Sequence, residues 1–173
     1  MKLKIFPFKK VKSTNSTAIR LINQSIKFGV VTSERQYRGR GQGTNRWISN
    51  YGNIFLSIFF PIKKNLSIKN ITKINLNVVK KVINKYINEK INIKPPNDIL
   101  LNQSKICGIL QEIIFKNNIK YIIIGIGINL NNSPIIPNYC TSYVNKYSKK
   151  KIKKLQIVNE LKMNFEKKFK NFI

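Results

Sequence analysis

Histidine is absent from this chain, and acidic residues are scarce: its 173 residues include 33 Lys and Arg but only six Asp and Glu. The lack of histidine excludes catalysis by Ser-His or Cys-His pairs. Cysteine is also rare, and Cys107 and Cys140 indicate neither a disulfide framework nor a zinc site, so a reducing cytoplasm is the expected location. No run reaches the roughly 18 apolar residues of a membrane span, and the N-terminus lacks the apolar core of a signal peptide. We therefore expect no membrane partner.

The net charge of +27 would normally suggest a nucleic-acid partner. Lys, Ile and Asn are all frequent together, however, and most lysines lie between apolar residues in predicted helices, which indicates a drift in composition along the whole chain. A field of this size is expected to attract ATP, pyrophosphate or an acidic protein. Physiological salt should weaken that attraction.

The few arginines gather in one segment, residues 34–47. This segment holds four of the five arginines and three alternating glycines: Arg35, Arg38, Arg40, Arg46, Gly39, Gly41 and Gly43. Alternating glycines let backbone N–H groups converge on an anion, and guanidinium groups bind phosphate or carboxylate bidentately. Trp47, the single tryptophan, is suited to stacking on a base or to filling a pocket. The alternatives are a solvated basic loop or an RGG-like binder of single-stranded nucleic acid, but the segment is short, does not repeat and lies between two predicted strands.

Apolar periodicity predicts the elements of a single α+β domain over residues 1–173, with a mostly antiparallel mixed sheet covered by helices. Strands are expected at residues 3–11, 30–35, 53–60, 99–101, 105–115 and 121–130. Helices are expected between Ser13 and Gly29, at 66–86 and at 152–172. The apolar faces of the two long helices are Ile71, Ile74, Val78, Val82 and Tyr86, and Leu155, Val158, Leu161, Phe165, Phe169 and Phe172. Residues 94–98 are expected to be extended, and 131–150 to form a loop.

Asp98 is the only aspartate of the chain. With Asn97 it offers hard oxygen ligands suited to Mg²⁺ held with a nucleotide phosphate, although an Asx turn would also explain it. Lys105 leads into a predicted strand interrupted by Gly108, where backbone or ligand can approach closely. The alternative for Lys105 is an ordinary surface lysine.

Two other places combine small or polar residues. Ser13 and Thr14 have an ordinary structural explanation as the N-terminal cap of a helix. Gly125 and Gly127 end a strand without opening a helix, so they are not a dinucleotide-binding fingerprint. They indicate a central strand kept narrow because something lies against it.

Five separated motifs occur in an order that resembles the biotin protein ligases, the biotin–[acetyl-CoA-carboxylase] ligases. They are Ser13-Thr14-Asn15; Gln36 followed by Gly39-Arg40-Gly41 and Trp47; Lys94-x-Pro-Asn-Asp98; Lys105-x-x-Gly-Ile-Leu-x-Glu112; and Gly125-x-Gly-Ile-Asn129. The similarity spans nearly the whole chain and implies a class II aminoacyl-tRNA-synthetase-like catalytic domain. It also implies a two-step reaction: biotin and ATP give biotinyl-5′-adenylate and pyrophosphate, and biotin then passes to a lysine of the biotin carboxyl carrier protein of acetyl-CoA carboxylase.

The resemblance further implies a role for each matching residue. Biotin would be bound by Ser13, Thr14, Asn15, Gln36, Gly39, Arg40, Lys105 and Gly108. The nucleotide would be bound by Arg38, Gly41, Trp47, Asn97 and Asn129. Lys105, Arg40 and Asp98 would be catalytic: Lys105 neutralises charge between carboxylate and α-phosphate, Arg40 shields the adenylate from water, and Asp98 holds Mg²⁺ and orients the triphosphate.

Three departures from the family pattern bear on these expectations. Gln42 replaces a second arginine, Pro95 replaces the tryptophan of Lys-Trp-Pro-Asn-Asp, and the sequence stops before the small β-barrel of most relatives. Ser13 lies so near the first residue that we expect no helix-turn-helix domain and no specific DNA binding. The oligomeric state stays open, a homodimer included.

Two rival functions remain to be weighed at this point. A lipoate or octanoyl transferase would carry an Arg-Arg-x-x-Gly-Gly-Gly segment and a histidine, and this sequence has neither. A basic nucleic-acid-binding protein would use residues 35–47 as an electrostatic clamp, and its binding would fall steeply with salt.

Overall fold

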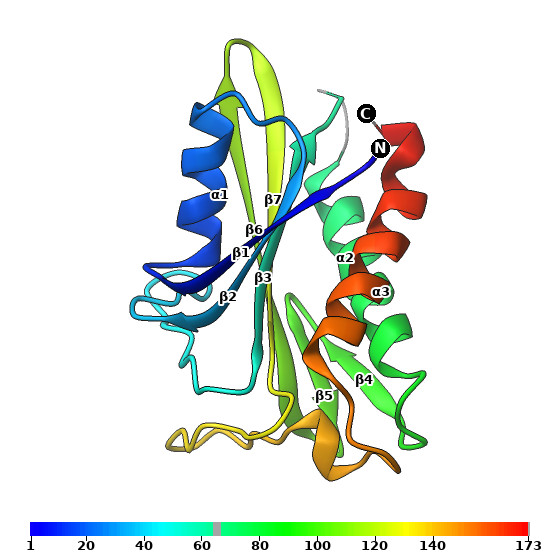
Figure 1. The fold of residues 1–173 in the computed structure, drawn as a ribbon. Coiled ribbons are helices and arrows are strands. Elements are labelled where there is room, and N and C mark those ends of the chain that lie inside the picture. The colour runs from blue at the N-terminus through cyan, green and yellow to red at the C-terminus, as the bar shows by residue number, and fades with distance from the viewer. Residues whose placement is uncertain (64–66, 173) are drawn as a thin grey trace.

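A seven-stranded sheet forms the centre of the computed structural model, which describes residues 1–63 and 67–172. The strand order is β1-β2-β3-β7-β6-β5-β4 (Figure 1). The strands are β1 (Lys4–Val11), β2 (Gly29–Gln36), β3 (Ile54–Pro61), β4 (Ile91–Lys94), β5 (Asp98–Leu101), β6 (Ser104–Lys116) and β7 (Ile119–Ile128). Only β1 and β2 pair in parallel; the other neighbours are antiparallel. The predicted α+β class and mostly antiparallel mixed sheet are confirmed.

Helices cover both faces of the sheet (Figure 1). Helix α1 (Thr14–Asn23) packs on one face, and α2 (Ile68–Ile83) and α3 (Lys154–Phe169) pack side by side on the other. Two short 3-10 turns, Val144–Lys146 and Lys170–Phe172, complete the regular structure. The site described below lies on the face that carries α1, because the opposite face is filled by the larger core.

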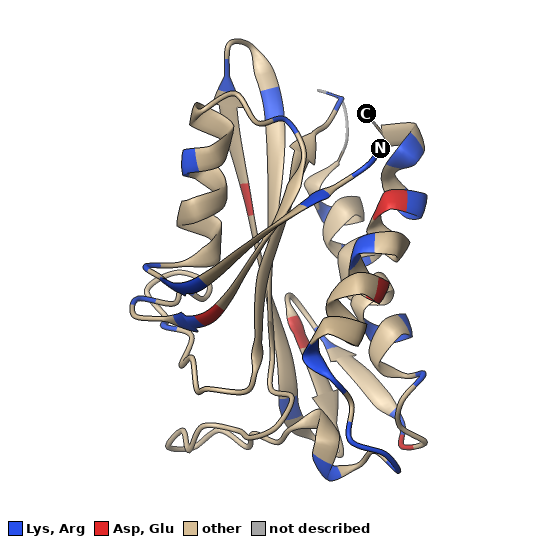
Figure 2. Ribbon diagram, viewed as in Figure 1, with Lys and Arg blue, Asp and Glu red and all other residues tan. Residues whose placement is uncertain are grey.

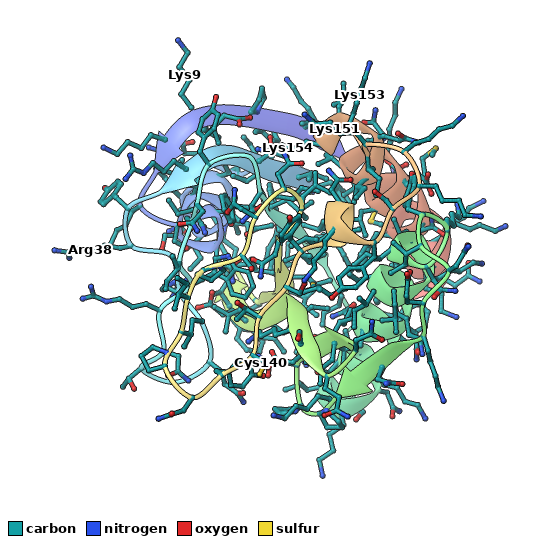
Figure 3. All side chains as sticks on the ribbon, turned by 90° about the horizontal axis from the view of Figure 1, so that it is seen from below. Lys9, Arg38, Cys140, Lys151, Lys153 and Lys154 are labelled. Atoms are coloured by element: carbon teal, nitrogen blue, oxygen red, sulfur yellow. The ribbon has the colours of Figure 1, made fainter. Side chains whose placement is uncertain are left out.

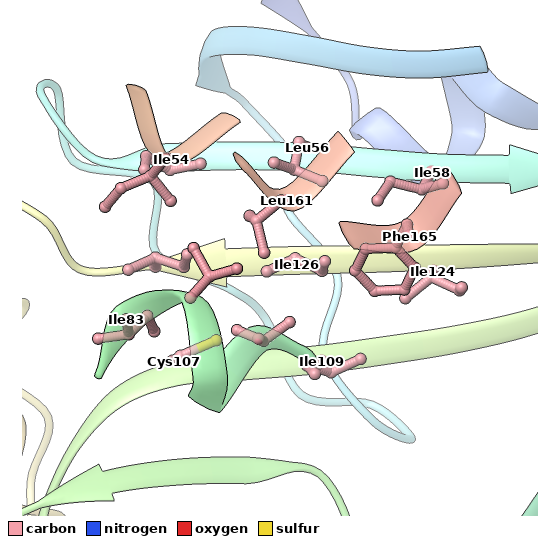
Figure 4. Close-up of a cluster of buried hydrophobic side chains, with 14 of the residues drawn as sticks. Ile54, Leu56, Ile58, Ile83, Cys107, Ile109, Ile124, Ile126, Leu161 and Phe165 are labelled. Atoms are coloured by element: carbon pink, nitrogen blue, oxygen red, sulfur yellow. The ribbon is translucent and has the colours of Figure 1, made fainter. Parts of the chain in front are cut away.

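Alternation along the two central strands divides their side chains between these faces. The core beneath α2 and α3 receives Ile54, Leu56, Ile58, Phe60, Ile122, Ile124, Ile126 and Ile128 (Figure 4). Phe59 and Ile123 point the other way and pack against α1. Each fully buried side chain of this size contributes roughly 1.5–3 kcal/mol, so the core under α2 and α3 fixes the strands that carry the site.

The structure corrects several details of the predicted elements. The short strand β4 was not predicted, because its four residues are too few to show a period. Leu155 is 65% exposed and does not belong to the buried face of α3, where Ile157 is buried instead. The predicted helix start at Leu66 lies outside the described residues, and α2 ends at Ile83, before Tyr86.

Basic side chains are spread over the helices, strands and loops, and the few acidic ones are scattered among them (Figure 2). This distribution fits a drift in composition better than a single nucleic-acid-binding stripe. In the part of the chain that the structure describes, no helix has both the length and the apolar character needed to cross a membrane.

Candidate functional site

Residues from all five sequence motifs line one cavity of about 470 Å³. It lies at the N-terminal end of α1, where Ser13, Thr14 and Asn15 form part of the wall. Strands β6 and β7 form the floor, and residues 40–48 and 136–141 form two further walls. A cavity of this volume lies within the range of small-molecule sites, roughly 300–1,000 Å³.

Three strand glycines make room for two side chains of the site. A Cβ atom added to Gly127 would lie 2.4 Å from the ring of Trp47, and one added to Gly108 would lie 2.7 Å from it. A Cβ atom on Gly125 would lie 2.2 Å from Asn15 Oδ1. The prediction that something lies against this strand is confirmed. The Trp47 ring packs over Gly108 and Gly127 and lines the cavity, and its stacking on a base stays a prediction.

The start of α1 forms a polar end of the cavity. Ser13 also caps the helix, since its Oγ accepts a hydrogen bond from Ser16 N at 3.4 Å. Gln36 Oε1 accepts from Thr14 N at 2.8 Å and from the Thr14 hydroxyl at 3.2 Å. Gln36 Nε2 donates to Ser49 Oγ at 3.0 Å. These bonds fix the orientation of the Gln36 amide beside two hydroxyl groups that line the cavity.

A second polar group connects the helix to the sheet. Asn15 accepts a hydrogen bond from the buried Ser57 hydroxyl and donates from Nδ2 to Glu112 Oε2 at 2.6 Å. The same carboxylate binds the Arg40 guanidinium bidentately, at 2.9 and 2.6 Å. Arg40 belongs to residues 38–46, which we call the glycine-rich loop. The carboxylate of Glu112 therefore joins this loop to the interior of the site.

Lys105 is held by one carboxylate and two aromatic rings. Its ammonium lies 2.8 Å from Asp98 Oδ1, with the two side chains only 20% and 13% exposed. The ammonium also lies 5.5 Å from the ring centroids of both Trp47 and Tyr139, within cation–π range. The Tyr139 hydroxyl donates to Asp98 Oδ2 at 2.7 Å. Burial, and then this hydrogen bond to the carboxylate, raise the pKa of Tyr139 to about 12, so it stays a donor at neutral pH.

An irregularity in β6 turns Lys105 toward the site. Strict alternation from Gly108 would place Lys105 on the opposite face, toward the core. The β5–β6 register shifts between Ile99 and Leu100, however, and both Ile106 and Cys107 are buried in the core. The extra residue brings Lys105 round to the face of Gly108, as bulges often do beside functional sites. Burial raises the pKa of the Cys107 thiol, so this cysteine is not a candidate nucleophile.

The predicted nucleotide-binding residues are placed unevenly. Gly41, Trp47, Asn97 and Asn129 line the cavity. Arg38 does not; it projects away from the protein (Figure 3) and borders a neighbouring hollow between the glycine-rich loop and residues that include Leu110 and Glu112. Gly39, predicted to bind biotin, borders that hollow as well. It has a packing role, since a Cβ atom there would lie 2.4 Å from Trp47 O.

Apart from Asp98 Oδ1, which is paired with the Lys105 ammonium, two buried polar atoms of the cavity residues lack hydrogen-bond partners within the described residues, Asn129 Oδ1 and Trp47 Nε1. The amide nitrogen of Asn129 is engaged, since it donates to Ser142 O at 3.1 Å. Buried polar groups in native proteins are nearly always paired. An acceptor and a donor without partners, on two residues that line the cavity, indicate a ligand that carries complementary groups.

The geometry does not form a protein-held metal site. Residues 1–63 and 67–172 contain no group of three or more His, Cys, Asp or Glu side chains that could hold a metal ion. Both oxygens of Asp98 are already engaged, one by Lys105 and the other by Tyr139. The amide nitrogen of Asn97 donates to Ile109 O at 3.1 Å. These contacts suit Asp98 to orienting Lys105, and the role of Asp98 in holding Mg²⁺ together with a nucleotide phosphate stays a prediction.

Several residues of the site had no assigned role from the sequence, among them Ser57, Glu112 and Tyr139. Ser57 has a detectable signal, because it is the one polar residue in the apolar run Ile-Phe-Leu-Ser-Ile-Phe-Phe. Glu112 ends the motif that begins at Lys105, but that motif assigns it no function. Tyr139 lies in a predicted loop and gives no signal, since its contact with Asp98 spans 41 residues.

Comparison with known proteins gives a consistent picture. Residues 7–129 match the model of the biotin/lipoate A/B protein ligase family. The bifunctional ligase/repressor BirA of Bacillus subtilis (strain 168) is 29% identical over 175 residues, which cover 94% of this chain and 53% of that protein. The chain thus spans about half the length of this curated relative.

Two solved structures share the fold. The biotin protein ligase of Leishmania major in complex with biotinyl-5-AMP superposes with a TM-score of 0.82 at 21% identity, covering 98% of this chain and 76% of that one. The biotin protein ligase of Aquifex aeolicus in complex with biotin and ATP also has a TM-score of 0.82, at 20% identity, covering 96% and 70%. The predicted catalytic-domain fold is confirmed.

Proposed function

This chain belongs to the biotin/lipoate A/B protein ligase family, and we propose that it is an ATP-dependent biotin protein ligase. In the first step a carboxylate oxygen of biotin attacks the α-phosphorus of ATP. The bond to the bridging oxygen of pyrophosphate breaks, which leaves biotinyl-5′-adenylate. In the second step the ε-amine of an acceptor lysine attacks the acyl carbon, AMP leaves, and the amine loses a proton. The observation that carries the proposal is Lys105, held by Asp98 in the same cavity as Thr14 and Gln36.

The polar end of the cavity suits the ureido ring of biotin. That ring offers two N–H donors and one carbonyl acceptor. The hydroxyl groups of Ser13 and Thr14 and the amide of Gln36 supply both acceptors and donors. Leu110 and the glycines of β6 and β7 provide apolar surface for the rest of the molecule.

Lys105 supplies what the first step needs most. The carboxylate and the triphosphate are both anionic, so they repel each other as they approach, and more negative charge gathers on the departing pyrophosphate. A fixed ammonium stabilises that charge in the transition state more than in water, because it is already oriented. Asp98 and Tyr139 hold Lys105 in place. The nucleophile is ionised at neutral pH, so the step needs no histidine to remove a proton.

Asn129 and Trp47 suit the adenine. Asn129 Oδ1 is buried without a hydrogen-bond donor, and the 6-amino group of adenine supplies one. The indole of Trp47 gives a flat apolar surface for the adenine ring. Arg40 at the rim covers the mixed anhydride and limits its hydrolysis. Any Mg²⁺ enters bound to the phosphates of ATP, as part of that substrate.

The acceptor we propose is the biotin carboxyl carrier protein of acetyl-CoA carboxylase, the carrier implied by the sequence motifs. An acidic carrier would be attracted by the net charge of +27. The cytoplasmic location and the absence of specific DNA binding remain predictions.

Biotin-dependent exchange of labelled pyrophosphate into ATP tests the proposal. The purified protein should show saturable exchange with biotin, and should show little with lipoate or octanoate, which lack the ureido ring. Exchange that depends on lipoate and not on biotin would show that the protein is a lipoate ligase and not a biotin ligase. Absence of exchange with either acid, together with nucleic-acid binding that disappears as salt rises, would favour the basic binding protein instead.

A further inference from the structure

We propose that Glu112 is a positioning residue that couples closure of the glycine-rich loop to recognition of the acid substrate. The identity of that substrate, biotin, rests on the proposed function. The coupling itself rests on the contacts of one carboxylate, which reach in two directions. Its Oε1 and Oε2 bind the guanidinium of Arg40, and Oε2 also accepts from Asn15.

On the loop side, Glu112 is a side-chain anchor to the sheet, in addition to the backbone bond from Arg38 N to Lys12 O, at 2.9 Å, where the loop begins. The remaining backbone contacts of the loop tip are internal: Gly41 N donates to Asn45 O at 2.8 Å, and Arg40 pairs with Arg46 as an isolated bridge. The loop is therefore a small hairpin that holds itself together. A bidentate guanidinium–carboxylate pair fixes both the position and the plane of the Arg40 side chain.

On the inner side, Glu112 sets the orientation of Asn15. A carboxylate only accepts, so the group facing it must be the Asn15 NH₂, and Oδ1 then faces Ser57. The Ser57 hydroxyl is in turn 2.8 Å from the hydroxyl of Thr14, which lines the substrate cavity. The charge at Glu112 is thus linked through two side chains, Asn15 and Ser57, to the Thr14 hydroxyl of the proposed biotin site.

The contacts with Arg40 and with Asn15 share the Glu112 carboxylate, so a change at Glu112 should affect both. Loss of the charge frees Arg40 and loosens the loop. Loss of the acceptor as well leaves the buried Asn15 amide nitrogen with only its longer bond to Leu110 O, at 3.2 Å, which loosens its orientation and disturbs Ser57 and Thr14. Glu112 itself need not touch substrate; it acts through Arg40 and Asn15.

Two variants distinguish the contact with Arg40 from the contact with Asn15. Glu112→Gln removes the charge but keeps a carbonyl oxygen for Asn15, whereas Glu112→Ala removes both. Glu34→Gln is the matched control, because it changes the net charge equally and breaks an ion pair with Lys154, at 3.1 Å, outside the cavity. Each protein is compared in two assays: trypsin cleavage after Arg40 and Arg46 without ligand, and the biotin KM in pyrophosphate exchange.

Both Glu112 variants should be cut in the loop roughly tenfold faster than the wild type, the scale of one lost charge-assisted pair, while Glu34→Gln is cut at the wild-type rate. The biotin KM should rise about tenfold in Glu112→Ala and clearly less in Glu112→Gln. If both Glu112 variants are cleaved at the wild-type rate, Glu112 does not hold the loop. If the biotin KM is the same in Glu112→Ala and Glu112→Gln, Glu112 does not act through Asn15.

Misfolding of a variant and failure of the proposed function can each be distinguished from failure of the proposed role of Glu112. Glu112→Gln has the same shape as the wild type, so its cleavage rate tests the contact with Arg40 even if Glu112→Ala fails to fold. If the wild-type protein shows no biotin-dependent exchange, the proposed function fails, but the cleavage comparison still decides whether Glu112 holds the loop.

Discussion

Lys105 is the one lysine among the described residues that line the cavity, and its ammonium group is closely held. The carboxylate of Asp98 lies 2.8 Å away, and two aromatic rings face it at 5.5 Å. Such a cage keeps the charge in one place with little reorganisation when a second anion arrives. The cage belongs to the site and not to the core, so Lys105 is expected to matter for reaction and little for folding.

Lys105→Ala should fold normally and lose adenylate formation by about 10²-fold or more, the scale of removing one preorganised charge. The loss should appear in the rate of pyrophosphate exchange at saturating biotin and ATP. Lys9→Ala is the control, because Lys9 lies on β1 and points away from the protein (Figure 3), so the change in net charge is the same. Exchange near the wild-type rate in Lys105→Ala would remove Lys105 from the mechanism.

At the scale of elements, the glycine-rich loop combines a flexible backbone with a concentration of positive charge. Its glycines make the loop costly in entropy to fix. Of its three arginines, Arg40 alone has a carboxylate partner in the structure, and Arg38 projects into solvent (Figure 3). An anionic ligand in the adjacent cavity would relieve the repulsion among these guanidinium groups.

Biotin together with ATP should therefore order the loop. A ligand present at ~100 times its dissociation constant stabilises the bound form by ~2.7 kcal/mol, enough to shift a loop equilibrium roughly a hundredfold. Trypsin cuts after Arg38, Arg40 and Arg46 should slow well before cuts elsewhere, and emission from Trp47 should change in parallel. The reference is the cutting rate in the β6–β7 turn at Lys116, away from the cavity. Loop cutting that is equally fast with and without both ligands would mean that the loop does not close over an adenylate.

At the scale of the whole molecule, the chain closes on itself through an acidic side chain of α3. Glu166 Oε1 accepts from Leu3 N at 2.6 Å and lies 2.9 Å from Lys162 Nζ. The first strand is thereby attached to the last helix, and Leu3 joins the core. Burial alone would raise the pKa of Glu166, but the hydrogen bonds and the nearby positive charges, including the N-terminus, lower it overall.

A lowered pKa makes this contact dependent on pH. Glu166 binds protons more weakly in the folded state, so its contribution is fully present above the pKa of the unfolded chain and is lost as pH falls through the folded pKa. Glu166→Gln should lower the free energy of unfolding by about 1 kcal/mol at pH 7 and by much less at pH 3. Denaturant unfolding at the two pH values measures the difference. The control is Glu34→Gln, whose side chain is 46% exposed and should matter little at either pH. An equal loss at both pH values would show that the Glu166 charge contributes nothing.

The sequence by itself determined the α+β class, most of the strands, and the set of motif residues that meet at the site. These are properties of local pattern: alternation assigns β3 and β7 to two buried faces, and the glycines at 108, 125 and 127 mark where side chains lie against the sheet. The roles given to Lys105, Asp98 and the other motif residues remain predictions, but their convergence in one cavity is what those motifs imply.

Only the tertiary structure decided which way Lys105 faces and what holds it. Alternation fixes a face only while the register holds, and the shift between β5 and β6 reverses it for Lys105. Tyr139 reaches Asp98 because the backbone at Cys140 and Ser142 pairs with that of Lys105, at 2.9 and 3.0 Å. The parallel pairing of β1 with β2 likewise depends on α1 returning the chain across the sheet. Contacts of this kind depend on segments far apart in sequence, where no local periodicity carries the information.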